Sequence, residues 1–176
     1  MLKDTVLNFT KHAFTVSVIA RNQSGLDKLI SSKDESGFIV PLRADYTDSA
    51  KLKDKIISAV NVAGEIETVI SWIHSYAESA HEVIASIISK GNPVCKYFHI
   101  TGSGSNNPGL NNDNVEKVIR NYKNISYRKI ILGFVAEGNK SRWLTNTEIS
   151  NGVIDAVNCD KELFIIGKTE PPDLSP

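Results

Sequence analysis

The chain has 176 residues, of which 41% are hydrophobic, and this length and composition are typical of one globular domain. Its 20 basic and 20 acidic side chains cancel, whereas proteins that bind nucleic acid or membrane surfaces usually carry a basic excess. The two cysteines and four histidines lack metal-ligand spacing, so we expect no metal site. No apolar run approaches the ~20 residues of a membrane helix, and no signal-peptide pattern opens the sequence. These features predict a soluble, cytoplasmic protein with no nucleic-acid or membrane partner.

Strand and helix patterns alternate along the sequence. Short apolar runs rich in β-branched residues predict buried strands at 14–20, 38–42, 67–73, 94–101, 127–135 and 163–166. Apolar residues at helical spacing predict helices at 1–11, 48–63, 76–90 and 115–122, and a last helix that opens at a capping-box pattern, 145–148. A polar, glycine-rich loop is expected at 102–113. We therefore predict a single domain over 1–167, followed by a proline-rich tail at 168–176.

This alternation favours a particular fold class. Strands that alternate with helices form βαβ units, which build a mostly parallel sheet with helices on both faces. Doubly wound domains of this kind normally open with a strand, but this chain opens with a predicted helix. The sequence therefore predicts an α/β fold that begins one element late.

Four segments carry a resemblance to a known family. They are FTVSVIAR (14–21), LRADYTD with its acid (42–48), SWIHSYAES (71–79) and the serine-bearing turn ITGSGS (100–105). On these segments the chain resembles the short-chain dehydrogenase/reductase family over nearly its whole length. The resemblance implies a Rossmann-type three-layer fold with a doubly wound parallel sheet that binds NAD(P).

The family's first strand and its glycine-rich turn have no counterpart in this sequence. In the strand order 3-2-1-4-5-6 the absent strand is the central one, and its absence would leave its two neighbours about 10 Å apart, twice the strand spacing. We expect that Met1 is an internal methionine and that about ten more residues precede it, enough for one strand and a tight turn. In the alternative, strand 14–20 pairs directly with strand 67–73. Pro41 predicts that strand 38–42 is an edge strand, because proline cannot donate to a sheet ladder.

Three residues are candidates for cofactor binding. Arg21 follows the strand that ends at residue 20, where an arginine accommodates the 2′-phosphate of NADP, so NADP is the expected cofactor. Asp45 occupies the place where the family positions an acid against the adenine amino group, whereas Asp48 is expected to cap the next helix. Ser75 is the third candidate, because it follows strand 67–73 at its carboxyl end. Arg21 can alternatively be a solvated surface arginine, and Asp45 a helix cap.

The family's catalytic set is only partly present. Ser103, or alternatively Ser105, matches the position of the catalytic serine. The Tyr-xxx-Lys motif is missing, because the residue four places after each tyrosine is alanine, threonine, serine or isoleucine. His74 and Tyr76 are the proposed substitutes, since they follow a strand at the edge where open α/β sheets bind ligands. In the alternative, His74 packs at a helix N-terminus and Tyr76 closes the crevice.

The remaining histidines and the region before the last helix complete the sequence-based expectations. His99 lies within an apolar strand and is expected to be a core histidine with a satisfied hydrogen bond. His12 and His81 fall on predicted helices and are expected to face solvent. Arg142 and Trp143 precede the capped helix, where the family keeps its substrate lid. Trp143 can alternatively pack against that helix.

Two functions are compatible with these residues. The first is an NAD(P)H-dependent oxidoreductase that acts on a small carbonyl substrate with a non-standard proton donor. The second is a non-catalytic dinucleotide-binding protein that serves as a redox sensor or interaction partner, and the missing Tyr-xxx-Lys motif favours it. Family members commonly associate through helices beside the sheet, so a homo-oligomer is also considered.

Overall fold

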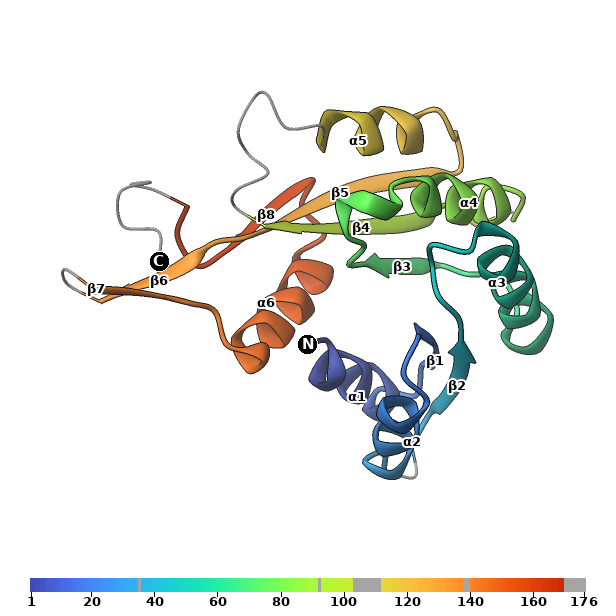
Figure 1. Ribbon diagram of the computed structural model, residues 1–176, viewed down its shortest axis with the longest axis horizontal. Helices are drawn as coiled ribbons and strands as arrows, with labels where there is room; N and C mark the ends of the chain where they lie inside the picture. The colour runs from blue at the N-terminus through green and yellow to red at the C-terminus, as the bar shows by residue number, and fades with distance from the viewer. Residues whose placement is uncertain (35, 92, 103–111, 138–139, 170–176) are drawn as a thin grey trace.

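The computed structural model describes residues 1–34, 36–91, 93–102, 112–137 and 140–169 (Figure 1). Their elements, in chain order, are α1 (Lys3–Lys11), β1 (Thr15–Ala20), α2 (Gln23–Ser31), β2 (Phe38–Arg43), α3 (Ser49–Ala63), β3 (Thr68–Ser71), the 3-10 turn η1 (Ser75–Ala77), α4 (Ser79–Ile88), β4 (Cys95–Gly102), α5 (Asn112–Arg120), β5 (Ile125–Leu132), β6 (Phe134–Glu137), β7 (Lys140–Trp143), α6 (Asn146–Cys159) and β8 (Leu163–Ile166). In this part of the chain, no helix is both long and apolar enough to cross a membrane.

The largest sheet has four parallel strands in the order β3-β4-β5-β8. β1 and β2 form a separate parallel pair, and β6 and β7 form an antiparallel hairpin. Within the described residues β1 pairs with β2 and not with β3, so the alternative in which strand 14–20 pairs directly with strand 67–73 is wrong. β2, which carries Pro41, has β1 as its partner on one side only, as expected for an edge strand.

Helices cover both faces of the four-stranded sheet, and Figure 1 shows α4 and α5 on the side opposite α6. One core cluster joins α3, α4 and α5 to the sheet, through Leu52, Ile84, Ile119, Tyr97 and Tyr127 among others. A second cluster joins α6 to the opposite face, with Phe98, Ile100, Ile130 and Val153 at its centre. α1 packs beside α6, where Thr5 Oγ1 donates to the Ser150 carbonyl at 3.3 Å. This three-layer α/β arrangement is a Rossmann-like fold and confirms the predicted fold class.

Local signals in the sequence explain where several helices begin. The Asp48 carboxylate accepts a hydrogen bond from the Lys51 backbone N–H and caps α3, as predicted. α3 ends at Gly64, whose φ of 87° suits glycine. Thr145 and Glu148 form the predicted capping box, in which each side chain accepts a hydrogen bond from the other residue's backbone N–H. Short-range hydrogen bonds of this kind depend on neighbouring residues alone, which is why the sequence predicted them.

Four elements differ from the sequence-based expectation, and one of them, β7, was not predicted as a strand. α2 was not predicted, although the Asn22 side chain caps it by accepting from the Gly25 N–H. The predicted helix 76–90 begins instead as the short turn η1 and continues as α4. The predicted strand 127–135 divides into β5 and β6 at Gly133, where any side chain would clash with the Lys168 carbonyl. This close backbone approach comes from a distant segment, so the local sequence pattern did not reveal it.

Candidate functional site

Side chains from three strand ends meet at the carboxyl edge of β1, β2 and β3. Arg21 directly follows β1, Tyr46 lies three residues after β2, and His74 lies three residues after β3. Tyr76 belongs to the turn η1, which His74 precedes. We call these four side chains, Arg21, Tyr46, His74 and Tyr76, the aromatic wall. The carboxyl edge of parallel strands is where open α/β sheets bind ligands.

The aromatic wall is a continuous stack. The Tyr76 ring lies between the other two rings, with its centroid 6.5 Å from that of Tyr46 and 5.4 Å from that of His74. The interplanar angles are 24° and 15°, so all three rings lie nearly parallel. The guanidinium carbon of Arg21 lies 5.8 Å from the Tyr46 ring centroid, within the range of a cation–π contact. The stack therefore joins the ends of all three strands.

Hydrogen bonds and burial shift the pKa values of two side chains at this edge. Asp45 Oδ1 accepts from the backbone N–H and the hydroxyl of Thr47, and these two bonds, together with the Arg21 charge, lower the pKa of Asp45. Asp45 Oδ2 lies 3.9 Å from Arg21 Nη1. Burial and the contact between the Tyr46 and Tyr76 hydroxyls, 3.3 Å apart, raise the pKa of Tyr46. The edge therefore carries an ionised Asp45 carboxylate, the Arg21 guanidinium and a neutral Tyr46 phenol.

The predicted cofactor residues are partly brought together. Arg21 and Asp45 are neighbours, and both side chains are exposed enough to contact a ligand. Ser75 is exposed at the start of η1, next to the wall. His74 precedes this turn without capping it through its side chain, and Tyr76 is 65% exposed. The predicted catalytic residue Ser103 and its alternative Ser105 lie outside the described residues.

The exposed rings and the guanidinium fit the adenosine half of a phosphorylated nucleotide. The exposed side of the aromatic stack, where Tyr76 is 65% exposed, presents apolar surface for a purine. An exposed arginine suits a phosphate group. A pyrophosphate usually requires backbone N–H groups in a glycine-rich turn between a strand and a helix. The described strand-to-helix turns are not rich in glycine. The wall therefore fits the adenosine and a ribose phosphate, while no described residues fit the pyrophosphate.

A cleft of about 240 Å³ lies at the carboxyl edge of the four-stranded sheet. Its lining comes from the ends of β3, β4 and β5, from β7 and from the start of α6, and consists of Trp72, Gly102, Leu132, Gly133, Trp143, Leu144 and Ile149. Trp143 thus lies where the resemblance places a substrate lid. Sequence reasoning missed Trp72 as a lining residue, although a large aromatic residue directly after an apolar strand was a usable signal. Tyr46 was missed for a different reason, because its role depends on contacts with the ends of other strands.

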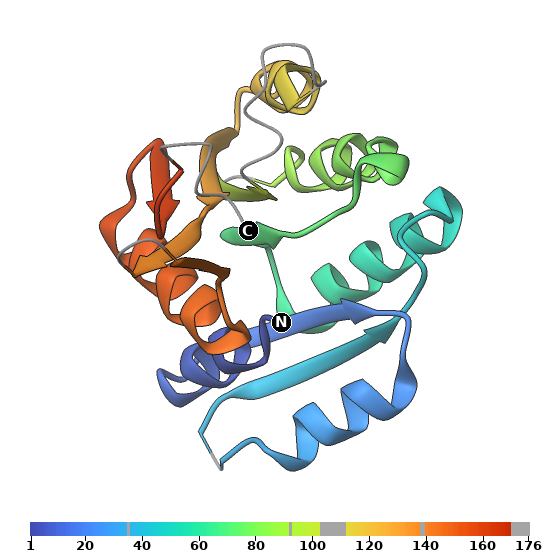
Figure 2. The same cartoon turned by 60° about the vertical axis from the view of Figure 1, so that its left-hand side comes forward.

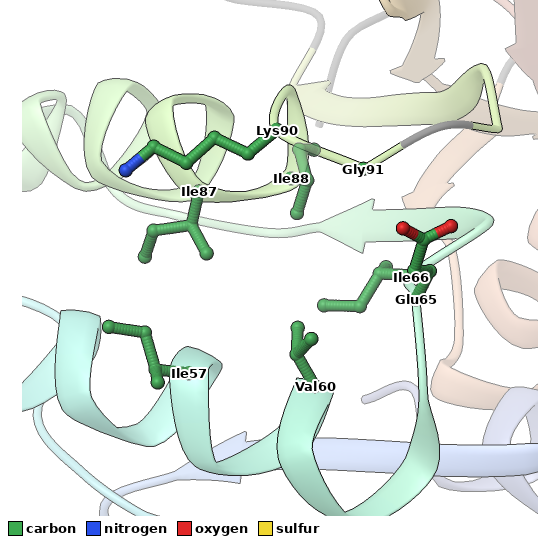
Figure 3. Close-up of a pocket in the computed structure, with 8 residues that line it drawn as sticks. All are labelled: Ile57, Val60, Glu65, Ile66, Ile87, Ile88, Lys90 and Gly91. Carbon is green, nitrogen blue, oxygen red and sulfur yellow. The ribbon is translucent and has the colours of Figure 1, made fainter.

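A second cavity, of about 230 Å³, lies between α3 and α4 (Figure 3). Ile57 and Val60 from α3 face Ile87 from α4 across it, with Glu65 and Lys90 at its rim. Glu65 and Ile66 precede β3, and Lys90 and Gly91 precede β4, so the cavity lies toward the amino edge of the sheet. The aromatic wall lies at the opposite, carboxyl edge. No predicted site residue lines it.

A group of polar side chains is buried between α4 and the sheet. His81 Nδ1 lies 2.9 Å from the Tyr97 hydroxyl and 3.4 Å from Ser71 Oγ, and His99 Nδ1 lies 2.8 Å from the Tyr127 hydroxyl. The two imidazole centroids are 4.5 Å apart. Burial lowers the pKa of His81 to about 4 and that of His99 to about 3. We call these five residues the buried His–Tyr cluster.

The histidine predictions therefore have different outcomes. His99 is 3% exposed and hydrogen-bonded, which confirms it as a core histidine. The prediction that His81 faces solvent is wrong, because this residue is 2% exposed. The helical pattern alone could not show that its partner, Tyr97, lies on the strand beneath α4. In the described part of the chain, no three His, Cys, Asp or Glu side chains gather closely enough to hold a metal ion.

Comparisons with known proteins support the fold and nothing finer. No family model and no curated protein matches the sequence. Among solved structures, an apo SCOR enzyme from Clostridium thermocellum is similar over 94% of this chain and 86% of that one, with 11% identity and a TM-score of 0.60. A short-chain dehydrogenase/reductase from Serratia marcescens BCRC 10948 is similar over 82% and 88% of the two chains, with 14% identity and a TM-score of 0.53. The fold is therefore that of short-chain dehydrogenase/reductase enzymes.

Proposed function

We propose that this protein binds NADP(H) and reduces a small carbonyl compound, in the manner of the short-chain dehydrogenases and reductases that share its fold. The observation that carries the proposal is the aromatic wall at the carboxyl ends of β1, β2 and β3. The net charge of +0 also favours a small-molecule ligand over nucleic acid or a membrane surface, and we propose a cytoplasmic location.

The wall offers a separate contact to each part of an adenosine phosphate. The exposed side of the Tyr76 ring in the stack provides apolar contact area for the purine, and Asp45, which precedes Tyr46 and contacts Arg21, can accept from its amino group. The Arg21 side chain is 57% exposed and contacts Asp45 only at 3.9 Å, so its N–H groups remain able to bind a ribose 2′-phosphate. NADP differs from NAD by this phosphate, so Arg21 should select NADP.

Substitution of Arg21 tests the proposed binding mode. We expect Arg21→Ala to weaken NADPH binding by about 1.5–3 kcal/mol, or about ten- to a hundredfold, because hydrogen bonds to a charged group are lost. NADH binding should change by less than about threefold. Titration calorimetry with both nucleotides would measure these losses.

Arg120→Ala is a matched control for this experiment. Arg120 is also an exposed arginine beside a carboxylate, with Nε 2.8 Å from Glu116, and its guanidinium lies 5.6 Å from the Tyr127 ring centroid. It lies at the end of α5, away from β1 in Figure 1, so neither nucleotide should lose affinity. Equal losses of NADPH and NADH affinity in Arg21→Ala would contradict the 2′-phosphate assignment. A wild-type chain that binds neither nucleotide would contradict the whole proposal.

For the reaction, we propose His74 or Tyr76 as the proton donor and Ser103 as the residue that orients the carbonyl oxygen. When bound, NADPH would supply the hydride. His74 and Tyr76 are exposed and follow β3 closely in the chain, as does Trp72, which lines the cleft. Both side chains carry a group that can donate a proton. Tyr76→Phe and His74→Asn should each be assayed for NADPH consumption with small aldehydes and ketones. Loss of turnover with unchanged NADPH affinity in one variant would identify the donor.

Binding without catalysis is the second candidate function. The Tyr76 hydroxyl lies 3.3 Å from the Tyr46 hydroxyl, and the sequence has no Tyr-xxx-Lys motif that would lower the pKa of a tyrosine. A protein that binds NADPH but consumes none with any carbonyl compound would favour this function. Turnover that survives in both variants would instead contradict the assignment of His74 or Tyr76 as the proton donor.

A further inference from the structure

The cleft at the carboxyl edge of the four-stranded sheet has an uncharged lining. Among the described residues, its lining combines two tryptophans with leucine, isoleucine and glycine, so the indole N–H groups are the only side-chain hydrogen-bond donors in that set. None of the seven described lining residues carries a carboxylate, ammonium or guanidinium. Sites that bind carboxylate or phosphate substrates normally use arginine or lysine. The lining therefore favours a neutral ligand.

The residue before Trp143 strengthens this preference. Arg142 is the cation adjacent to the cleft in sequence, and its guanidinium donates to both oxygens of Glu148, at 2.8 and 2.9 Å. Arg142 Nη2 also lies 3.9 Å from Glu137. Two carboxylates thus surround this guanidinium, so its charge is already paired within the chain. An anionic ligand in the cleft would therefore have to compete with Glu148 for Arg142.

The volume and the two indoles indicate the shape of the ligand. A buried cavity of about 150 Å³ is enough to hold benzene, so about 240 Å³ holds one ring with a short substituent. Trp72 is half-buried, whereas Trp143 on the hairpin is more than half exposed. A flat ring in contact with both indoles would cover Trp143 and gain aromatic contacts on both sides.

We propose that this cleft binds a neutral single aromatic ring that carries a carbonyl group, so that the substrate is a small aromatic aldehyde or ketone. An indole N–H of Trp72 or Trp143 donates to the carbonyl oxygen, and the ring contacts the apolar wall. This assignment rests on the proposed carbonyl reduction, but the preference of the cleft for a flat neutral ring can be measured without turnover.

The chain offers a direct readout of the cleft. It has two tryptophans, and both line the cleft, so a proton–nitrogen correlation spectrum contains two indole signals and both report on it. Trp72→Phe and Trp143→Phe assign the two signals. We would titrate the wild-type chain with acetophenone, with 4-acetylbenzoate, which adds a negative charge, and with cyclohexyl methyl ketone, which is neutral but not flat.

Acetophenone should shift both indole signals in a saturable manner. Each of the other two probes should bind at least threefold more weakly, and Trp143→Ala should weaken acetophenone binding about two- to tenfold, the range typical of one aromatic contact. Glu148→Gln keeps a residue able to complete the capping box but releases Arg142 from a charged partner. This variant should improve the binding of 4-acetylbenzoate and leave acetophenone binding unchanged.

Adenosine 2′,5′-bisphosphate, titrated into the same samples, separates failure of the cleft assignment from failure of the proposed function. If this nucleotide binds but acetophenone leaves both indole signals unshifted, or binds no better than 4-acetylbenzoate, the cleft assignment is wrong and nucleotide binding stands. If the nucleotide fails to bind while acetophenone binds as expected, the proposed function is wrong and the cleft preference stands. If free nicotinamide binds at least as tightly as acetophenone and displaces it, the cleft belongs to the cofactor and the substrate assignment is wrong.

Discussion

The aromatic wall and the buried His–Tyr cluster are built from the same types of ring but differ in environment. In the buried cluster each imidazole has a tyrosine hydroxyl within 2.9 Å, and both imidazoles are at most 3% exposed. In the wall the rings stack on one another, and His74 and Tyr76 are exposed while Tyr46 is half-buried. Side chains buried in this way are out of reach of a ligand, whereas the exposed side chains of the wall are accessible to one. Residue type alone therefore does not identify a functional histidine or tyrosine in this chain.

The largest expected difference is in the free energy of unfolding, when one tyrosine of each group is replaced by alanine. Tyr97→Ala should lower the free energy of unfolding by about 3–5 kcal/mol, because it removes a fully buried ring and leaves His81 Nδ1 with the longer 3.4 Å contact to Ser71. Tyr76→Ala should change the free energy of unfolding by less than about 0.5 kcal/mol, since that ring is exposed. Urea unfolding of both variants at pH 7 would measure the difference. Similar losses would show that the wall, too, is part of the folded core.

Acid should destabilise the protein through the buried cluster. The pKa values of His81 and His99 are about 4 and 3 in the folded chain, below the value of about 6.5 for an unfolded histidine. Below pH 6.5 the unfolded chain therefore binds more protons, so the free energy of unfolding falls as the pH falls. Between pH 7 and pH 5 each of the two histidines should account for a loss of about 2 kcal/mol, measurable by urea unfolding above the range in which carboxylates titrate.

Two variants separate this effect from general acid sensitivity. His12→Ala should leave the pH dependence unchanged, because His12 is exposed at the end of α1. His81→Leu should reduce the slope of the free energy of unfolding against pH by about half, since one of two buried histidines is removed. An equal slope in wild-type and His81→Leu chains would contradict the account of a buried neutral histidine.

The smallest effect concerns the two thiols, which repeat the contrast between buried and exposed groups. Cys95 is buried, and burial raises its pKa to about 12, whereas Cys159 is exposed at the end of α6. The native protein should therefore react with one equivalent of a thiol reagent, and the second equivalent should react only after unfolding. Cys159→Ser should abolish the native reaction. Labelling of Cys95 in the native Cys159→Ser chain would show that β4 opens more easily than the packing implies.

Much of the fold could be predicted from the sequence, because local patterns determine its elements. The strands at 38–43, 95–102 and 163–166 follow apolar runs, and the Asp48 cap and the capping box at Thr145 need only neighbouring residues. Alternation of strands and helices was enough to predict a parallel sheet between helical layers. The places of Arg21, Asp45 and His74 after strand ends also followed from this pattern.

Contacts between distant segments decided the rest. The stack of Tyr46, His74 and Tyr76 exists because separate strands end at one edge, and the cleft exists because β7 brings Trp143 to the end of β3, which Trp72 follows. His81 was misplaced because helical periodicity gives the face of a helix but not the side chains beneath it. A sequence pattern thus determined which residues form each element and follow each strand. Only the tertiary structure decided which of them meet, because those contacts join residues far apart in the chain.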